Sequence, residues 1–429
     1  MKIIENQNEI LAFIKSLDAR VGGESFSAER TVRGIINDVK EKGDEAVRDY
    51  TARFDSENAV YYRVPEIELI SNFRKYEENE VEFMTALKRC KANITAFHNA
   101  QKREGFTLAD KNGVITGQRV RPLDTVGIYV PGGTAPLFST VLMCAIPARI
   151  AGVKRVIITT PPRKDGTANP DVLAAARLCG VTEVYLCGGA QAIAAMAYGT
   201  EIIPRVDKIV GPGNVYVTMA KKLLFGTIDI DMIAGPSEIL ILADKTADPR
   251  YIAADLLSQA EHDTLASSVL ITDSREVAEQ TLRELDKQLA TLPREGIAAK
   301  SLADYSAILL VEDMDKAVEY SEMIAPEHLE VLTANPLEYI GKCDNVGSLF
   351  LGAYSPEPLG DYFAGPNHVL PTNGTARFFS PLGVDCFTKK SSYIYYTQSA
   401  LAVAADDIIM LAEREELSAH ANAVRVRKG

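Results

Sequence analysis

The chain of 429 residues is longer than the size at which one hydrophobic core keeps growing, so we expect two sizeable domains or one domain with large insertions. Hydrophobic residues make up 47% and charged residues 24%, which is typical of a globular protein and excludes wholesale disorder and a fibrous architecture. The formal net charge of −12 gives a surface that repels phosphate backbones and anionic lipids. We therefore expect neither a nucleic acid nor a membrane as partner.

The cysteines and the N-terminal segment indicate a cytoplasmic protein. The six cysteines are scattered and form no CxxC pair, as expected for reduced thiols in a protein core. The first segment, MKIIENQNEILAFIKSLD, mixes charged with apolar residues and so lacks the apolar core of a signal peptide. No segment approaches the ~18 to 20 apolar residues of a membrane span.

The first part of the chain predicts helices, followed by alternating strands and helices. Helix-period apolar positions fall at 27–54 and 65–103. Short β-branched runs then predict strands at 125–130, 153–160, 182–187 and 206–210. Helical stretches follow them near 137–151, 169–179, 190–198 and 215–225. Repeated βα units of this length predict a parallel sheet that is covered on both faces.

A second α/β set begins after Gly235-Pro236. Strands are expected at 237–244, 267–273 and 307–313, and helices at 248–261, 275–291 and 314–324. The last fifty residues contain the run SSYIYY and a terminal helical stretch, which together are too short to own a core. That segment must pack on the main body or on another subunit.

The motif DLLSQAEHD offers the first candidate metal ligands. Gln259 and His262 are three residues apart on an expected helix, so their side chains share one face and could converge on an ion. Asp361 lies in an expected loop between Gly360 and Gly365, which give the backbone freedom to turn a carboxylate inward. His420 lies on the expected terminal helix. When each residue is taken alone, an ordinary helix end, an N-cap or a surface group is the more common explanation.

Donors of these types suit particular metals. An amide oxygen, imidazoles and a carboxylate fit zinc, manganese or cobalt better than copper(I) or an iron–sulfur cluster.

The motif APEHLE supplies a candidate acid/base pair. Glu327 and His328 offer an adjacent carboxylate and imidazole, either of which can act as a base near neutral pH once its pKa is adjusted. The alternative is the start of a helix with acids placed for its dipole. His368, in a Gly/Pro-rich loop, is a further ambiguous imidazole. His98, on an amphipathic helix, reads as a surface or half-buried residue without a functional role.

Three glycine turns each follow an expected strand and precede an expected helix, where backbone N–H groups favour a phosphate. They lie at 129–135, 186–192 and 209–214. A complete G-x-G-x-x-G is absent, because Tyr216 occupies the third glycine position after Gly211 and Gly213. A standard Rossmann pyrophosphate site is therefore not supported, and a tight turn without a ligand remains the alternative.

Taken together, the chain resembles histidinol dehydrogenase from about residue 24 to its end. Seven matching segments occur in order: YVPGGTA, GPGNVYVTMAK, IAGPSEILILAD, DLLSQAEHD, APEHLE, GDYFAGPNHVLPT and ELSAHANAV. The resemblance implies that L-histidinol is oxidised to L-histidine through the aldehyde, with two NAD reduced per turnover and one zinc per site. The chain departs from the family pattern at residues 136–140, where a Tyr-Pro-Ser-Ser-like run is usual.

The resemblance also implies a role for individual residues. The implied zinc ligands are Gln259, His262, Asp361 and His420, and the implied catalytic pair is Glu327 and His328. Substrate contacts are implied for Ser237, Gln259, His262, His328, Asp361, His368, Glu415 and His420. NAD contacts are implied for Tyr129, Gln191 and Asn214.

The expected fold is α/β, with two incomplete Rossmann-like domains, a helical N-terminal segment and a C-terminal dimerisation tail. The expected parts are an N-terminal arm (1–23), a discontinuous domain with the metal and catalytic residues (24–105 with 236–380), a domain with the NAD contacts (106–235), and a tail that reaches the partner of a homodimer (381–429). Two other functions remain open: a zinc hydrolase without a redox cofactor, and a binding protein with a structural metal. Structural zinc, however, favours cysteine-rich sites.

Overall fold

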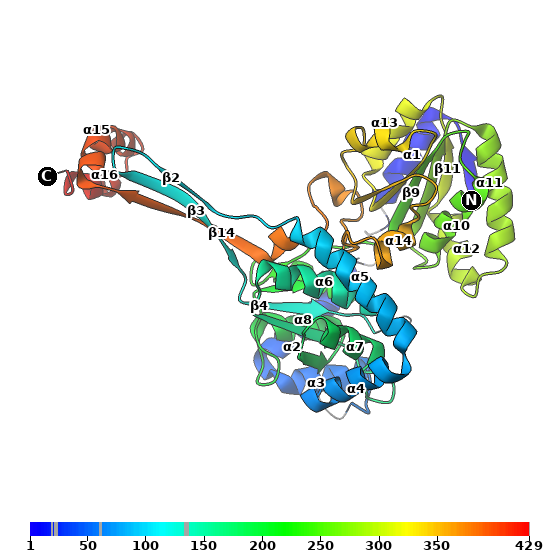
Figure 1. Cartoon of the computed structure of the whole chain (residues 1–429), viewed down its shortest axis with the longest axis horizontal. Coiled ribbons are helices and arrows are strands. Elements are labelled where there is room, and N and C mark those ends of the chain that lie inside the picture. Colours follow the sequence, from blue (N-terminus) through cyan, green and yellow to red (C-terminus); the bar gives the residue numbers. More distant parts are fainter. Residues whose placement is uncertain (19, 21–24, 60–61, 133–136, 429) are drawn as a thin grey trace. The chain divides into compact units, whose positions relative to one another are not determined.

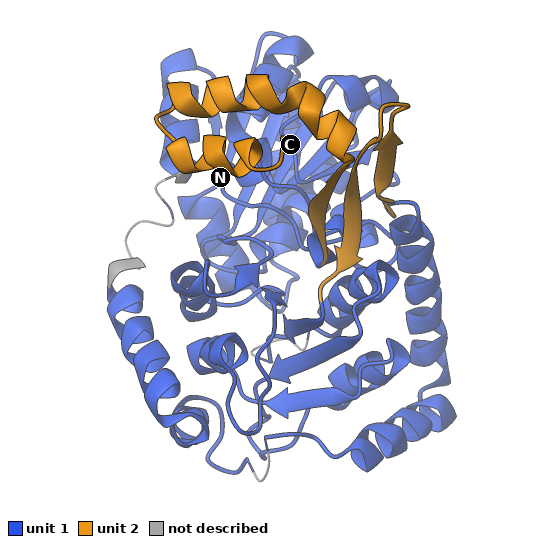
Figure 2. Ribbon diagram, turned by 90° about the vertical axis from the view of Figure 1, so that its left-hand side faces the viewer, with its two compact units in different colours: residues 1–101, 124–387 blue, residues 102–123, 388–429 orange. Residues whose placement is uncertain are grey.

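A computed structural model of the chain describes residues 1–18, 20, 25–59, 62–132 and 137–428. The chain divides into two compact units, coloured separately in Figure 2. Unit 1 comprises Met1–Gln101 and Asp124–Phe387, and unit 2 comprises Lys102–Leu123 and Thr388–Gly429. Of the YVPGGTA turn, residues 133–135 lie outside the described residues, as does residue 136.

Unit 1 contains a parallel sheet, here called the β4 sheet, with the strand order β6-β5-β4-β7-β8. Its strands are β4 (Thr125–Tyr129), β5 (Arg155–Thr160), β6 (Glu183–Leu186), β7 (Lys208–Val210) and β8 (Asp229–Ile230). The crossover helices are α6 (Phe138–Ala151), α7 (Pro170–Leu178), α8 (Gly189–Tyr198) and α9 (Val215–Leu224). Helices α8 and α9 contact each other, as do α6 and α7, which is the pairing expected when consecutive crossovers change face in the middle of the sheet.

The N-terminal helices pack on this same sheet. They are α2 (Ser25–Lys42), α3 (Asp44–Phe54), α4 (Glu66–Asn79) and α5 (Val81–Asn99). Helix α2 contacts α8 and α9, α4 contacts α7, and α5 contacts α6 (Figure 1). The apolar stripe of α2, with Val32, Ile35 and Val39, is buried in one cluster with α8 residues. These contacts group residues 25–99 with the β4 sheet, whereas the sequence patterns grouped 24–105 with 236–380; periodicity identifies an apolar face but not the surface that covers it.

A second parallel sheet of unit 1, here called the β9 sheet, has the strand order β1-β11-β10-β9-β12-β13. Its strands are β1 (Lys2–Ile4), β9 (Glu238–Ala243), β10 (Ser267–Thr272), β11 (Ala307–Leu310), β12 (His328–Leu332) and β13 (Ser348–Leu351). Alternate residues of β9 face opposite sides: Ile239 and Ile241 join the cluster with one set of helices, and Leu240 and Leu242 join the cluster with the other. The two layers are α10 (Pro249–Ala260), α11 (Arg275–Leu289) and α12 (Glu295–Asp304) on the first side, and α1 (Gln7–Asp18) and α13 (Met314–Ile324) on the second.

The N-terminal segment belongs to this sheet. Strand β1 pairs in parallel with β11, and Ile10 and Ile14 of α1 are buried in the same cluster as Leu240. The sequence patterns treated residues 1–23 as a separate arm, because a three-residue strand leaves too short a pattern to be recognised.

Both sheets share one topology, which confirms the expected α/β class. Numbered in chain order from β4 and from β9, each sheet runs 3-2-1-4-5, and β1 is added at the edge of the second. This is the classic doubly wound order without its sixth strand. No described helix is long and apolar enough to cross a membrane, and none of the six cysteines, all of which are described, forms a disulfide.

Unit 2 is an antiparallel sheet with two helices. Strands β2 (Phe106–Ala109), β3 (Val114–Pro122) and β14 (Thr388–Tyr396) have the order β14-β3-β2, and α15 (Gln398–Arg414) packs against α16 (Ser418–Arg425). The sequence patterns placed residues 106–123 in the NAD domain. The β2–β3 hairpin instead pairs with β14, which lies more than 260 residues away in the sequence.

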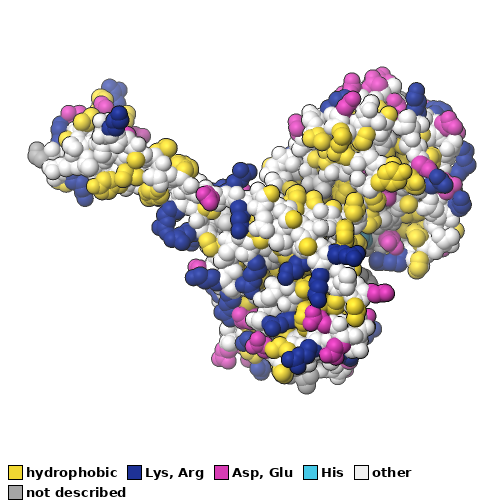
Figure 3. Space-filling view, in the orientation of Figure 1, with side chains coloured by type: hydrophobic (Ala, Val, Ile, Leu, Met, Phe, Trp, Pro, Cys, Tyr) yellow, Lys and Arg dark blue, Asp and Glu magenta, His cyan; other side chains and the backbone are white. Residues whose placement is uncertain are grey.

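The apolar side chains of unit 2 are largely exposed. The buried hydrophobic residues among its described residues are alanines, such as Ala405 and Ala421. Figure 3 shows hydrophobic side chains along this part of the chain. The larger exposed side chains on its strands and helices include Phe106, Leu108, Ile394, Tyr395, Val403, Met410 and Leu411. As expected from the sequence, this segment does not own a core of large residues.

Candidate active site

A cluster of buried acids and histidines lies where β9 and β12 begin. Glu238 is the first residue of β9 and His328 the first of β12, so the site lies at the amino edge of the β9 sheet. Helix α10 ends at Ala260, just after Gln259, and α13 ends at Ile324, just before Glu327. Helix C-termini carry partial negative charge, which favours a cation nearby.

His328 is buried and is held in one tautomer. Its Nδ1 lies 2.9 Å from the backbone oxygen of Glu238, and because a carbonyl oxygen can only accept, Nδ1 carries the proton. Burial lowers the pKa of His328 to about 4, so the ring is neutral near pH 7. Nε2 therefore keeps a free lone pair, which is what a general base requires.

Glu327 precedes β12 and is also buried. Its Oε2 accepts a hydrogen bond of 2.9 Å from the N–H of Glu238 and lies 3.7 Å from Nδ1 of His328. Burial raises the pKa of Glu327 well above its usual range, and the nearby carboxyl groups of Glu238 and Asp361 add to the effect. The alternative considered for APEHLE, the start of a helix, is wrong, because a buried strand begins at His328.

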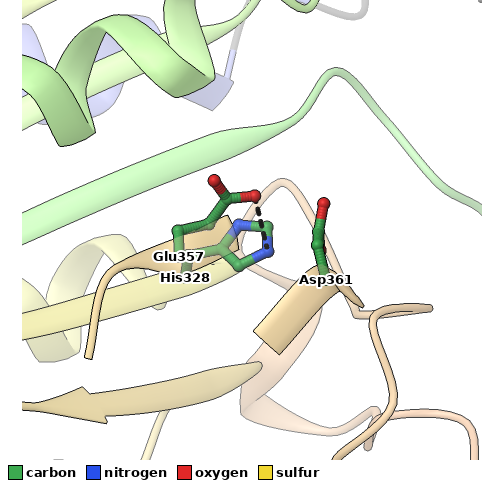
Figure 4. A group of neighbouring side chains, drawn as sticks. All are labelled: His328, Glu357 and Asp361. Atoms are coloured by element: carbon green, nitrogen blue, oxygen red, sulfur yellow. Dashed lines mark ion pairs between the residues drawn. The ribbon is translucent and has the colours of Figure 1, made fainter. Parts of the chain in front are cut away.

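Asp361 lies on α14 (Glu357–Tyr362), a short helix rather than the loop expected from the sequence. Gly360 is needed here for lack of space and not for backbone freedom, because a Cβ at this position would lie 2.7 Å from the ring of Phe350. Glu357, on the same helix, faces His328, with 4.0 Å between its Oε1 and Nε2 of the ring (Figure 4). Ligand atoms of His328, Glu357 and Asp361 lie within 4.8 Å of one another, as a metal-binding cluster requires.

Gln259 adds a buried amide oxygen that has no hydrogen-bond partner among the described residues. Its amide nitrogen lies 2.8 Å from Nδ1 of His262, so the two residues meet as the three-residue spacing predicted. His262 follows the end of α10 and is exposed. The amide oxygen of Gln259 is fully buried and has no hydrogen-bond partner among the described residues. An orphaned oxygen beside an imidazole and a carboxylate cluster fits a metal ion of the zinc class.

Two further expected contacts lie in the same unit. Nδ1 of His368 lies 3.2 Å from the backbone oxygen of Asp361 and 3.7 Å from its carboxylate, and burial lowers the pKa of His368 to about 4. Ser237 directly precedes β9 and is half-buried. His98, expected at the surface or half-buried, is instead fully buried, with Nδ1 at 2.7 Å from Gln101.

Glu415 and His420 belong to unit 2. Glu415 caps the C-terminus of α15, and His420 lies on α16. Both side chains are exposed in that unit.

Sequence reasoning missed the acids that support α14. Oε1 of Glu330, on β12, accepts a 2.7 Å hydrogen bond from the N–H of Glu357 at the start of that helix. The carboxyl groups of Glu330 and Asp255 lie within hydrogen-bond reach of each other, and burial together with Asp255 raises the pKa of Glu330 well above its usual range. A glutamate inside the fully buried strand HLEVL was the available signal.

The expected NAD contacts lie at the opposite edge of the other sheet. Tyr129 ends β4, Gln191 lies in the first turn of α8 after β6, and Asn214 caps α9 after β7. All three are therefore at the carboxyl edge of the β4 sheet, where doubly wound folds bind nucleotides. The Asn214 side chain accepts hydrogen bonds of 3.1 Å from the N–H groups of Tyr216 and Val217.

The glycine turns at this edge use their backbone N–H groups internally. Gly188 donates to Asp55, Gly189 donates to the Tyr129 hydroxyl, and Gly211 donates to Asp231. A phosphate cradle needs such groups free. This agrees with the absence of a complete Rossmann fingerprint.

Comparisons with known proteins assign the whole chain to one family. The family model described as histidinol dehydrogenase matches residues 19–428. Histidinol dehydrogenase from Clostridium acetobutylicum is 52% identical over 97% of this chain and 96% of its own length. That from Listeria monocytogenes is 53% identical over 100% of this chain and 99% of its own. The crystal structure of histidinol dehydrogenase from Elizabethkingia anophelis superposes with a TM-score of 0.92 at 40% identity and covers 100% of this chain and 98% of that one.

Proposed function

The chain belongs to the histidinol dehydrogenase family, and on that premise we propose that it oxidises L-histidinol to L-histidine through the aldehyde, with two NAD reduced per turnover. The observation that carries this is the identity of about half of all positions over nearly the full length of both chains. The buried acid/base pair at the amino edge of the β9 sheet supplies what the chemistry needs.

We propose Gln259, His262, Asp361 and His420 as the zinc ligands. The buried, unpartnered amide oxygen of Gln259 and its contact with His262 support this set. When bound, zinc supplies a Lewis acid that holds the nitrogen and oxygen donors of the substrate. His328 is left out of the set because its free Nε2 is needed as a base.

The roles of the two catalytic residues follow from their protonation states. His328 is neutral with Nδ1 protonated, so its Nε2 takes the hydroxyl proton as the alcohol is oxidised. The aldehyde must add water before it can lose a second hydride, and Glu327 takes the proton of that water in its carboxylate form, which the raised pKa makes more basic. Ser237, His368 and Glu415 complete the proposed substrate contacts, and Tyr129, Gln191 and Asn214 the proposed NAD contacts.

We further propose a homodimer in which unit 2 of one protomer completes the site of its partner. Unit 2 carries Glu415 and His420 and exposes large apolar side chains, which a second copy of the chain would cover. To test this, inactive His262→Ala and His420→Ala proteins are mixed after subunit exchange has been verified with tags. Recovery of activity is expected; a mixture that stays inactive despite exchange would refute the crossed site.

The test of the activity itself is NADH formation from L-histidinol, followed by absorbance, with L-histidine quantified in parallel. Two NADH per histidine are expected. A hydrolase that uses the same acid/base pair would form no NADH, so that outcome would overturn the proposal.

A further inference from the structure

Asp55 stands out as a half-buried carboxylate that the proposed chemistry does not use. It caps the C-terminus of α3 and reaches across to the first turn of α8. Its Oδ2 accepts two hydrogen bonds, one of 2.9 Å from the N–H of Gly188 and one of 3.2 Å from the amide nitrogen of Gln191. A single oxygen thus fixes both the glycine turn and the side chain of Gln191.

The surroundings leave Gln191 little freedom. Its side chain is 1% exposed and folds back over Gly189, where an added Cβ would lie 2.7 Å from its Oε1. A Cβ at Gly188 would lie 2.7 Å from Oδ1 of Asp55, so this turn and the carboxylate also fit closely. Because the amide nitrogen of Gln191 donates to Asp55, the orientation of this amide is fixed by a residue that is not itself a proposed NAD contact.

We propose that Asp55 is a positioning residue for NAD: it holds the Gln191 amide and the Gly188–Gly189 turn in the arrangement that receives the cofactor. This rests on the proposed NAD contacts at the carboxyl edge of the β4 sheet. The role depends on one acceptor oxygen and not on the negative charge, because both hydrogen bonds end on Oδ2.

Two variants of Asp55 separate the role of the acceptor oxygen from that of the negative charge. Asp55→Asn keeps an acceptor oxygen in place and should bind NAD nearly as the wild type does. Asp55→Leu keeps a branched side chain, although a larger one, and has no acceptor. Its dissociation constant for NAD, measured by calorimetry on the intact enzyme, should rise on the order of tenfold, as expected when the hydrogen bond that holds Gln191 is lost. If Asp55→Leu does not fold, Asp55→Ala removes the same acceptor with less bulk.

Asp44 provides the matched control. It lies on the same helix, is similarly half-buried, and accepts a 3.1 Å hydrogen bond from the N–H of Ile202, with no contact to a proposed NAD residue. Asp44→Leu should lower the melting temperature without changing the NAD dissociation constant. The KM for histidinol should stay unchanged in every Asp55 variant that binds zinc, which separates positioning from general damage.

A double-mutant cycle with Gln191→Ala tests whether Asp55 acts on NAD binding through Gln191. If Asp55 acts through Gln191, Asp55→Leu should weaken NAD binding much less in the Gln191→Ala background than in the wild type. Fully additive losses, equal losses in the Asn and Leu variants, or wild-type affinity in Asp55→Leu would each overturn the inference. A wild-type protein that neither binds nor reduces NAD would refute the proposed function itself, whereas an active enzyme with unchanged affinity in Gln191→Ala would refute only the positioning role.

Discussion

The two sheets of unit 1 have the same strand order but carry their functional residues at opposite edges. The proposed NAD residues lie at the carboxyl edge of the β4 sheet, where helices α8 and α9 begin, and the proposed catalytic cluster lies at the amino edge of the β9 sheet, where α10 and α13 end. Helix N-termini favour anions and helix C-termini favour cations. One topology therefore offers a phosphate-bearing cofactor and a metal ion the edges that suit each of them.

The two edges also differ in how their carboxyl and side-chain amide groups are paired. At the β4 sheet, Asp55 and Asp231 accept backbone N–H groups of the glycine turns. At the β9 sheet, the amide oxygen of Gln259 and Oε1 of Glu357 are buried without a partner in the described part of the chain. Paired groups preorganise a site, whereas buried acceptor oxygens without a hydrogen bond are suited to bind a ligand.

The largest expected effect comes from removing the metal. Dialysis against a strong chelator should abolish histidinol oxidation, and stoichiometric zinc should restore it, because the amide, imidazole and carboxyl groups proposed as ligands offer the substrate no Lewis acid of their own. NADH binding, followed by its fluorescence, should survive chelation, since the NAD residues belong to the other sheet. Full turnover by protein shown to be metal-free would contradict the metal assignment, and joint loss of both properties would contradict the separation of the two edges.

The next effect separates the two oxidations within the β9 site. Glu327→Gln keeps the shape but cannot accept a proton, so oxidation of supplied histidinal should fall by about 10² to 10⁴ while alcohol oxidation falls less. His328→Asn should show the opposite bias. Steady-state rates with each substrate measure the difference, and a zinc content equal to that of the wild type is the control. Equal losses on both substrates in both variants would mean that the pair acts as one coupled unit.

A third change tests whether the buried ion pair between Lys221 and Asp231 at the β4 sheet stabilises the fold. Lys221 and Asp231 form a buried ion pair around Gly211, with Lys221 donating to its carbonyl at 3.0 Å and Asp231 accepting its N–H at 2.8 Å. Lys221→Met leaves a buried carboxylate uncompensated and should lower the free energy of unfolding by about 3 to 5 kcal/mol in urea titrations. Arg155→Met, which breaks the more exposed pair with Glu183, should cost about 1 kcal/mol or less. Similar costs for the two variants would contradict this account.

Most of the fold could be predicted from the sequence, because local patterns fix its parts. The run at 237–244 contains β9, and the helices expected near 248–261 and 314–324 match α10 and α13 within a few residues. The pairing of the β2–β3 hairpin with β14 could not be predicted, since it joins segments whose own patterns do not name a partner. Periodicity likewise could not say which sheet α2 covers.

The candidate site could be predicted from the sequence only in part, for a related reason. Gln259 and His262 meet because helical spacing is a local rule. Glu357 and Asp55 look like ordinary turn or helix-end acids in the sequence, and the burial of Glu357 and the hydrogen bonds of Asp55 depend on elements that lie far away in the chain. The choice of the amino edge for catalysis also depends on where β9 and β12 start relative to each other, which the sequence does not state.

The smallest expected effect concerns the pH dependence of stability at the β4 sheet. Burial raises the pKa of Asp55 to about 6, against an ordinary value of 3.8, although its bonds to Gly188 and Gln191 lower it. Between these values the folded state binds the proton more tightly than the unfolded state, so this group makes the protein more stable as the pH falls from about 7 towards 4. Asp55→Asn has no such proton. The free energy of unfolding of the wild type minus that of Asp55→Asn should therefore rise by on the order of 2 kcal/mol over this window, as measured by urea denaturation at several pH values. If this difference in the free energy of unfolding stays constant or falls on acidification, the hydrogen bonds from Gly188 and Gln191 outweigh the cost of burial. The pKa of Asp55 in the folded protein would then not lie above its ordinary value.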